Sequence, residues 1–190
     1  MNKQLEPPLR KAIAFLEEHG YRYAVIGGIA LSQWQAVRVT RDVDIKVLVP
    51  DTDFASVRTA IRAAFPDPAR TDQRPNPYIV AVMIEGVIVD FLLATPGYEE
   101  QIIQRAVQHD LGGWWVWICS PEDLIIQKVY SRRLKDWPDV EALLIKQRDH
   151  LDQKYIEYWV DQFAQALYEP DILTQYRCLV ARVNALPRKS

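Results

Sequence analysis

The stretch IGGIALSQWQAVRVTRDVDIKV, residues 26–47, combines a glycine pair with two acids in a run rich in valine and isoleucine. Side chains alternate along a strand, so in the segment DVDIKVL, residues 42–48, Asp42, Asp44 and Lys46 would share one face, opposite an apolar core face. Two acids this close repel each other unless something neutralises them, which a divalent cation does. The stretch therefore predicts a strand that presents paired carboxylates to a cation.

The glycine pair, Gly27 and Gly28, follows an apolar run at 21–26 and opens a helical pattern at 29–37. Free backbone N–H groups and the helix dipole at a helix start attract phosphate. Taken alone, a glycine pair is usually only a turn, and an acid pair is usually only a solvated surface. Together the two patterns favour phosphoryl or nucleotidyl transfer.

A third acid, Asp90, lies in VIVDFLL, the second arm of a hairpin predicted over 78–94 with its turn at Glu85-Gly86. An aspartate is poorly suited to an apolar strand, although it could simply face outward on a half-exposed one. If this strand neighbours 43–49, Asp90 completes a site of three carboxylates. Two metal ions held there could activate a hydroxyl and stabilise a departing pyrophosphate.

The predicted elements run helix, strand, helix, strand, helix, hairpin, helix, strand, and then helices only. This order predicts an α+β fold, with a small mixed sheet and flanking helices followed by a helical C-terminal region. We expect domains at 1–119 and 120–190. Helices are expected over 7–19, from 51 or 52 to 64, over 97–108 and over 121–134, the last of them capped by Ser120. Asp136 and Asp152 are expected to cap further helices.

The 190 residues carry a formal net charge of −2, and the pI is about 5.9. This balance disfavours broad binding to nucleic acids or membranes, although a local basic patch stays compatible with it. No stretch approaches the roughly 20 apolar residues of a spanning helix, and the N-terminus lacks an apolar signal core. Cys119 and Cys178 show no disulfide or metal spacing, so we expect a reduced, cytoplasmic protein.

The glycine pair, the segment RVTRDVDI at 38–45 and the isolated Asp90 resemble the signature of the DNA polymerase β-like nucleotidyltransferase superfamily. The R-x-T-x-D-x-D form is most similar to the minimal nucleotidyltransferases that include AbiEii-type toxins of toxin–antitoxin systems. It is also similar to small antibiotic nucleotidyltransferases. The segment at 120–143 resembles that family's helix with a lysine and a later Lys-Asp pair, whereas the residues after about 150 match no known pattern.

The resemblance implies a role for each residue of the signature. Asp42, Asp44 and Asp90 would hold Mg²⁺, as two ions, and Asp90 could instead act as the base for an incoming hydroxyl. Gly27 and Gly28 would cradle the triphosphate of an NTP through their backbone N–H groups. Many members carry serine at the second glycine position, so Gly28 lacks that hydroxyl contact.

Basic side chains add candidate ligands for the nucleotide phosphates. Lys128 lies beside the apolar stripe of its predicted helix and could reach a phosphate, or it could only cover apolar surface. Arg132 would continue the same face one turn on. Arg38 is a weaker candidate, and Arg41 is better explained as balancing the acids. Asp136 and its neighbour Asp139 are more typical of a helix start than of catalysis.

Three tryptophans in the apolar run at 112–120 could stack a nucleotide base. Trp115 and Trp117 would share one strand face and Trp114 would lie on the other. We therefore expect at least one of these two sets to belong to the core.

The function that the resemblance implies is transfer of a nucleoside monophosphate from an NTP, such as ATP, to a hydroxyl acceptor. The acceptor could be an RNA 3′ end such as that of tRNA, a protein side chain or a small molecule. A toxin role would add a cognate antitoxin as partner. The alternative is a catalytically idle module that keeps the fold and binds a nucleotide or a partner. An idle cluster of acids would be a liability, which favours the enzyme.

Overall fold

The chain separates into two compact units in the computed structural model, which describes residues 4–36, 39–67 and 76–187. The first unit comprises Met1–Ala30 and Val39–Ser120, and the second comprises Leu31–Arg38 and Pro121–Ser190. The predicted domain boundary between residues 119 and 120 stays a prediction.

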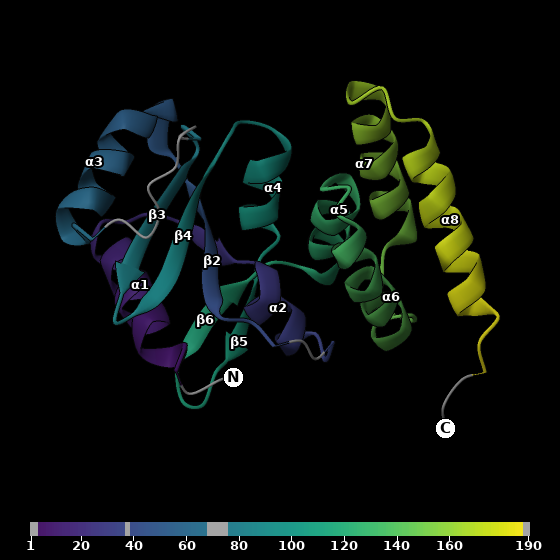
Figure 1. The fold of residues 1–190 in the computed structure, drawn as a ribbon, viewed down its shortest axis with the longest axis horizontal. Coiled ribbons are helices and arrows are strands. Elements are labelled where there is room, and N and C mark those ends of the chain that lie inside the picture. The colour runs from purple at the N-terminus through teal and green to yellow at the C-terminus, as the bar shows by residue number, and fades with distance from the viewer. Residues whose placement is uncertain (1–3, 37–38, 68–75, 188–190) are drawn as a thin grey trace. The chain divides into compact units, whose positions relative to one another are not determined.

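A single mixed sheet of six strands forms the centre of the first unit, within the described residues (Figure 1). Its order is β3-β4-β2-β1-β6-β5, in which β2 is parallel to β4 and β1 is parallel to β6. The other neighbours are antiparallel. The strands are β1 (Tyr23–Val25), β2 (Asp42–Leu48), β3 (Ile79–Ile84), β4 (Val87–Ala94), β5 (Val107–Asp110) and β6 (Trp115–Ile118). The predicted fold class, with helices after a mixed sheet, is confirmed.

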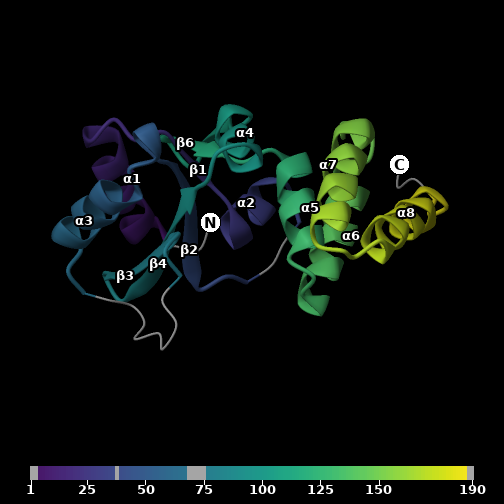
Figure 2. The same ribbon diagram turned by 90° about the horizontal axis from the view of Figure 1, so that it is seen from above.

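Helices cover both faces of this sheet: α1 and α3 lie on one side, and α4 lies on the other (Figures 1 and 2). Alternation along β2 explains the arrangement, because Val43, Ile45 and Val47 are fully buried on one face of the strand. The helices are α1 (Glu6–Glu18), α2 (Gly27–Gln33), α3 (Phe54–Ala64) and α4 (Tyr98–Gln104), with a short 3₁₀ turn, η1 (Pro50–Thr52).

The second unit is helical, as predicted. Its elements are α5 (Pro121–Tyr130), the 3₁₀ turn η2 (Leu134–Asp136), α6 (Trp137–Lys146), α7 (Gln153–Ala166) and α8 (Asp171–Asn184). The apolar stripe of α8 is largely buried, with Tyr176 fully enclosed and Val180 half-buried. The Gln147 side chain donates to the carbonyl of Trp34 at 3.0 Å, which ties the end of the 31–36 segment to α6.

Several predicted boundaries were wrong for local reasons. The cap of α3 is Asp53, whose side chain accepts from the backbone N–H of Ser56, because Asp51 and Thr52 adopt positive φ in η1. The helix predicted over 97–108 ends at Gln104, and β5 pairs with β6 from Val107 onward. The helix predicted over 121–134 ends at Tyr130.

Neither set of tryptophans belongs to the core, contrary to the prediction. Trp115 and Trp117 are 62% and 41% exposed, and Trp114 is half-buried with the Arg10 guanidinium 4.1 Å from its ring centroid. The core side of β6 is formed by Val116 and Ile118 instead. Among the described residues, no helix combines the length and apolarity needed to cross a lipid bilayer.

Candidate active site

The three predicted acids lie on two neighbouring strands. In the parallel pair β2 and β4, Asp44 is the register partner of Asp90, and Asp42 lies one pleat earlier, opposite Ile88. Asp42 and Asp44 are half-buried, whereas Asp90 is only 8% exposed. Because side chains two residues apart share a face, all three carboxylates belong to the same face of the sheet. The strand neighbourhood on which the three-carboxylate hypothesis depended is therefore present.

Gly27 brings the start of α2 against Asp44. Its φ is +64°, and a Cβ at this position would lie 2.1 Å from Asp44 Oδ2. The backbone N–H of the preceding residue, Ile26, donates to the Asp44 carbonyl at 3.0 Å. Only glycine satisfies both the left-handed backbone and the close approach of the carboxylate. The glycine pair and the acids, predicted from separate patterns, thus meet in the first unit.

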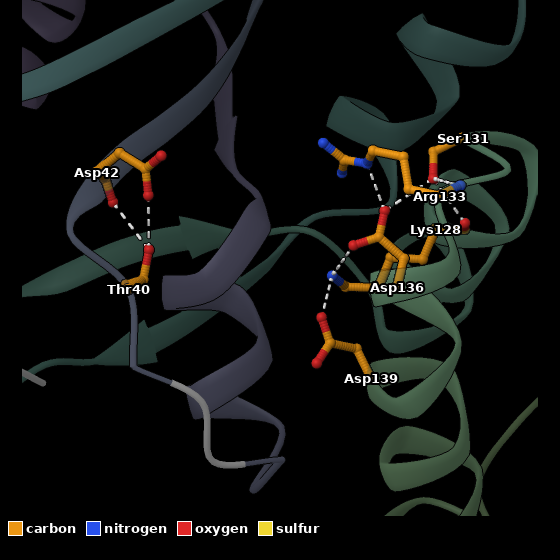
Figure 3. A network of polar contacts seen from close by, with 7 residues as sticks. All are labelled: Thr40, Asp42, Lys128, Ser131, Arg133, Asp136 and Asp139. Carbon is orange, nitrogen blue, oxygen red and sulfur yellow. Dashed lines mark hydrogen bonds and ion pairs between the residues drawn. The ribbon is translucent and has the colours of Figure 1, made fainter.

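Gly28 makes a similar close approach to Thr40. A Cβ on Gly28 would lie 2.4 Å from Thr40 Cβ and 2.7 Å from Thr40 Oγ1. The Thr40 hydroxyl donates to Asp42 Oδ1 at 2.8 Å (Figure 3). Sequence reasoning assigned no role to Thr40, although it is the threonine of the R-x-T-x-D-x-D form.

The fourth polar residue of that face, Lys46, is 2% exposed and forms an ion pair with Glu99 of α4. Glu99 also accepts hydrogen bonds from the backbone N–H and the hydroxyl of Thr95, each at 2.7 Å. Burial would raise the pKa of the Glu99 carboxyl, but the Lys46 charge and these hydrogen bonds hold that pKa below its ordinary value. Helix α4 therefore covers the sheet face next to the acids, at Lys46. The positive charge of Lys46 is neutralised by Glu99.

The donor set around Asp42, Asp44 and Asp90 suits a hard divalent cation. Within the described ranges, no three acidic, histidine or cysteine side chains already converge as a metal cluster. Mg²⁺ in proteins commonly takes one or two carboxylates and completes its shell with water and substrate phosphates. The Asp44 and Asp90 register pair, beside the glycine-lined start of α2, fits that requirement.

The basic candidates lie elsewhere in the chain. Arg38 lies outside the described residues. In the second unit, Lys128 is 7% exposed and its ammonium lies 2.7 Å from Asp139 and 3.6 Å from Asp136 (Figure 3). Arg132 follows the end of α5 rather than continuing its face, and it pairs with Glu169 at 2.9 Å.

Asp136 is an acceptor inside this cluster and not the predicted side-chain cap of α6. It is fully buried and accepts from the Ser131 hydroxyl at 2.8 Å and from Arg133 Nε at 2.6 Å. The predicted cap Asp152 does hold the start of α7, through the backbone N–H of Tyr155 at 3.0 Å. Ser131 and Arg133 lie in the short connection after α5, and only Lys128 comes from α5 itself, so the helix-start pattern of 136–139 did not reveal that Asp136 accepts from these side chains.

Two solved structures share the fold of this chain. An antigenic nucleotidyltransferase-like protein from Paracoccidioides brasiliensis is 19% identical, with a TM-score of 0.52, and the match covers 88% of this chain and 91% of that one. The solution structure of the antibiotic-resistance factor ANT(2'')-Ia is 15% identical, with a TM-score of 0.58, over 98% of this chain and 100% of that one. At these identities the likeness establishes the nucleotidyltransferase fold.

The family follows from the sequence itself. The chain belongs to the family described as nucleotidyl transferase of unknown function (DUF2204), whose model matches residues 6–170. Among the curated proteins, none matches the chain. The resemblance to the nucleotidyltransferase superfamily is thus confirmed.

Proposed function

We propose that the protein is a Mg²⁺-dependent nucleotidyltransferase that moves a nucleoside monophosphate from an NTP to a hydroxyl acceptor. The observation that carries the proposal is the register pairing of Asp44 with Asp90, with Asp42 one pleat earlier on the same face. Membership in a nucleotidyl transferase family supports the same chemistry. Mg²⁺ held by these acids would neutralise the triphosphate and stabilise the charge that develops on the leaving group.

The proposed step gives Asp90 the acceptor proton. The acceptor hydroxyl oxygen forms a bond to the α-phosphorus of the NTP. The bond between that phosphorus and the oxygen that bridges the α- and β-phosphates breaks, which releases pyrophosphate. The hydroxyl proton passes to a carboxylate oxygen of Asp90, whereas Asp42 and Asp44 would hold the metal. The start of α2 at Gly27 and Gly28 offers backbone N–H groups to the phosphates.

Three basic residues are proposed as ligands of the nucleotide phosphates, and the support for each differs. Lys128 and Arg132 remain candidate phosphate ligands on the resemblance alone, because their contacts within the second unit are with Asp139 and Glu169. Arg38 rests on the sequence only. The acceptor stays open between an RNA 3′ end, a protein and a small molecule, and so does a toxin role with a cognate antitoxin.

Label transfer tests the proposal and identifies the acceptor class. Purified protein is incubated with Mg²⁺ and each α-labelled NTP in turn, with small RNA, lysate protein, lysate small molecules or no acceptor. We expect label in one fraction with wild type and none with Asp44→Ala. Asp67→Asn, an exposed acid in the same unit, is the matched control and should retain transfer. Absence of transfer together with absence of Mg²⁺-dependent nucleotide binding would favour the idle, partner-binding alternative.

A further inference from the structure

The contact between Gly28 and Thr40 admits only one side chain. A Cβ on Gly28 would stand 2.4 Å from Thr40 Cβ, which is closer than nonbonded carbon atoms approach. Thr40 Cβ is attached directly to the backbone, so it cannot move aside as the end of a long side chain could. The steric demand of Thr40 therefore explains why residue 28 is glycine.

Thr40 uses the space that Gly28 leaves to reach Asp42. Its hydroxyl lies 2.8 Å from Asp42 Oδ1 and 3.3 Å from the Asp42 backbone oxygen. A hydroxyl has one proton, and a hydrogen bond to a charged oxygen is the stronger of the two. Figure 3 shows the Thr40 hydroxyl within reach of both Asp42 oxygens, and the bond to Oδ1 restrains the orientation of the carboxylate.

We propose that Thr40 is a positioning residue that orients the Asp42 carboxylate for binding a metal ion. The absence of a side chain at Gly28 leaves the space that Thr40 needs for this role. The inference rests on the proposed function, since it assigns a role to Asp42. Hydrogen-bonding partners behind metal ligands orient the ligand, and removing one commonly costs about 10–100-fold in metal affinity. The two glycines then have similar roles, because each leaves space for one side chain: Gly27 for Asp44 and Gly28 for Thr40.

Mn²⁺ binding to the nucleotide-free protein, followed by electron paramagnetic resonance, tests the proposal without any turnover. Thr40→Val keeps the shape and removes the hydroxyl, and we expect at least about 10-fold weaker Mn²⁺ binding. Thr40→Ser keeps the hydroxyl and should stay close to wild type. Thr59→Val is the matched control, since the Thr59 hydroxyl donates to the Ala55 carbonyl on the exposed face of α3.

Each result has a defined meaning. Wild-type affinity in Thr40→Val, or equal weakening in Thr40→Ser, overturns the positioning role. Asp42→Asn separates this proposal from the function: if it leaves Mn²⁺ affinity unchanged, the metal assignment fails and the positioning role fails with it. If Asp42→Asn weakens binding and Thr40→Val does not, only the positioning role is wrong. Thr40→Ala, which adds no atoms, replaces Thr40→Val if the latter does not fold.

Thermal unfolding tests the shared space independently of any metal. Gly28→Ala should lower the melting temperature by about 3–10 °C, because it overpacks the contact with Thr40. In a Thr40→Gly background the same change should cost less than about 2 °C. Equal losses in both backgrounds would overturn the assignment of Gly28 as the space for Thr40.

Discussion

Asp44 and Asp90 are register partners on the parallel strands β2 and β4, although a helix and a hairpin arm separate them in the chain. Adjacent carboxylates on neighbouring strands repel, so the arrangement lowers the stability of the sheet unless a cation compensates it. Proteins tolerate such local conflict mainly at functional sites. The pairing is the observation on which the proposed metal site depends.

Asp90→Asn tests the proposed base directly. Asparagine keeps the shape of the side chain but cannot take the acceptor proton, so we expect transfer to fall by about 10²–10⁴-fold. Mg²⁺-dependent nucleotide binding should be retained far better than turnover. Single-turnover label transfer and nucleotide titration measure the two quantities separately. Turnover near the wild-type rate would remove Asp90 from the proton-transfer role.

Gly27→Ala should destabilise the first unit much more than Gly20→Ala. Both glycines have similar φ, +64° and +69°, but only Gly27 faces a neighbour, Asp44 Oδ2, where the added carbon would stand. Gly20→Ala should lower the free energy of unfolding by about 1–2 kcal/mol, the cost of left-handed backbone. Gly27→Ala should cost roughly 2–5 kcal/mol, because overpacking adds to that strain. Urea denaturation of both variants decides the point, and equal losses would contradict the close approach to Asp44.

The alternation of side chains along β2 made the placement of Asp42 and Asp44 predictable. Period-two spacing placed Asp42 and Asp44 together and buried Val43, Ile45 and Val47, as the structure confirms. Strand order was not predictable in the same way, because the Asp44 and Asp90 pairing depends on which strand docks beside β2. A single sequence carries no local signal for such a long-range choice.

Contacts between residues far apart in the chain account for the other features that the sequence did not predict. The Gly28 and Thr40 contact depends on how the start of α2 folds back over the strand, and the ion pairs of Lys128 depend on the packing of α5 with α6. The tryptophans of β6 were misassigned because an apolar composition predicts burial. At this end of the sheet only the edge strand β5 lies beyond β6.

Lys128→Met should destabilise the second unit. The ammonium lies near two buried carboxylates, Asp139 at 2.7 Å and Asp136 at 3.6 Å. Its loss removes this positive charge from both, although Arg133 still pairs with Asp136. Breaking a buried ion pair from one side typically costs about 3–5 kcal/mol of unfolding free energy. The exposed Lys146, at the end of α6, provides the control, because Lys146→Met should change stability by less than about 0.5 kcal/mol. Unchanged stability with lost nucleotide affinity in Lys128→Met would instead establish Lys128 as a phosphate ligand.

Asp136 should make the second unit sensitive to acid. Its burial would raise the pKa of the carboxyl, but hydrogen bonds from Ser131 and Arg133 and the charge of Lys128 lower that pKa below the ordinary value. The folded state therefore binds the proton less readily than the unfolded state, so the stabilisation is complete above about pH 4. It is lost as the pH falls from there through the folded-state pKa.

The Asp136→Asn variant isolates this contribution, because asparagine does not titrate. Wild type should lose more unfolding free energy than Asp136→Asn between about pH 5 and pH 2, so their stability curves should converge in acid. Urea denaturation at a series of pH values measures the difference. Asp67→Asn, at an exposed carboxyl of the first unit, is the control for the substitution itself. Parallel curves for wild type and Asp136→Asn would show that the Asp136 carboxyl has the same pKa in the folded and unfolded chain.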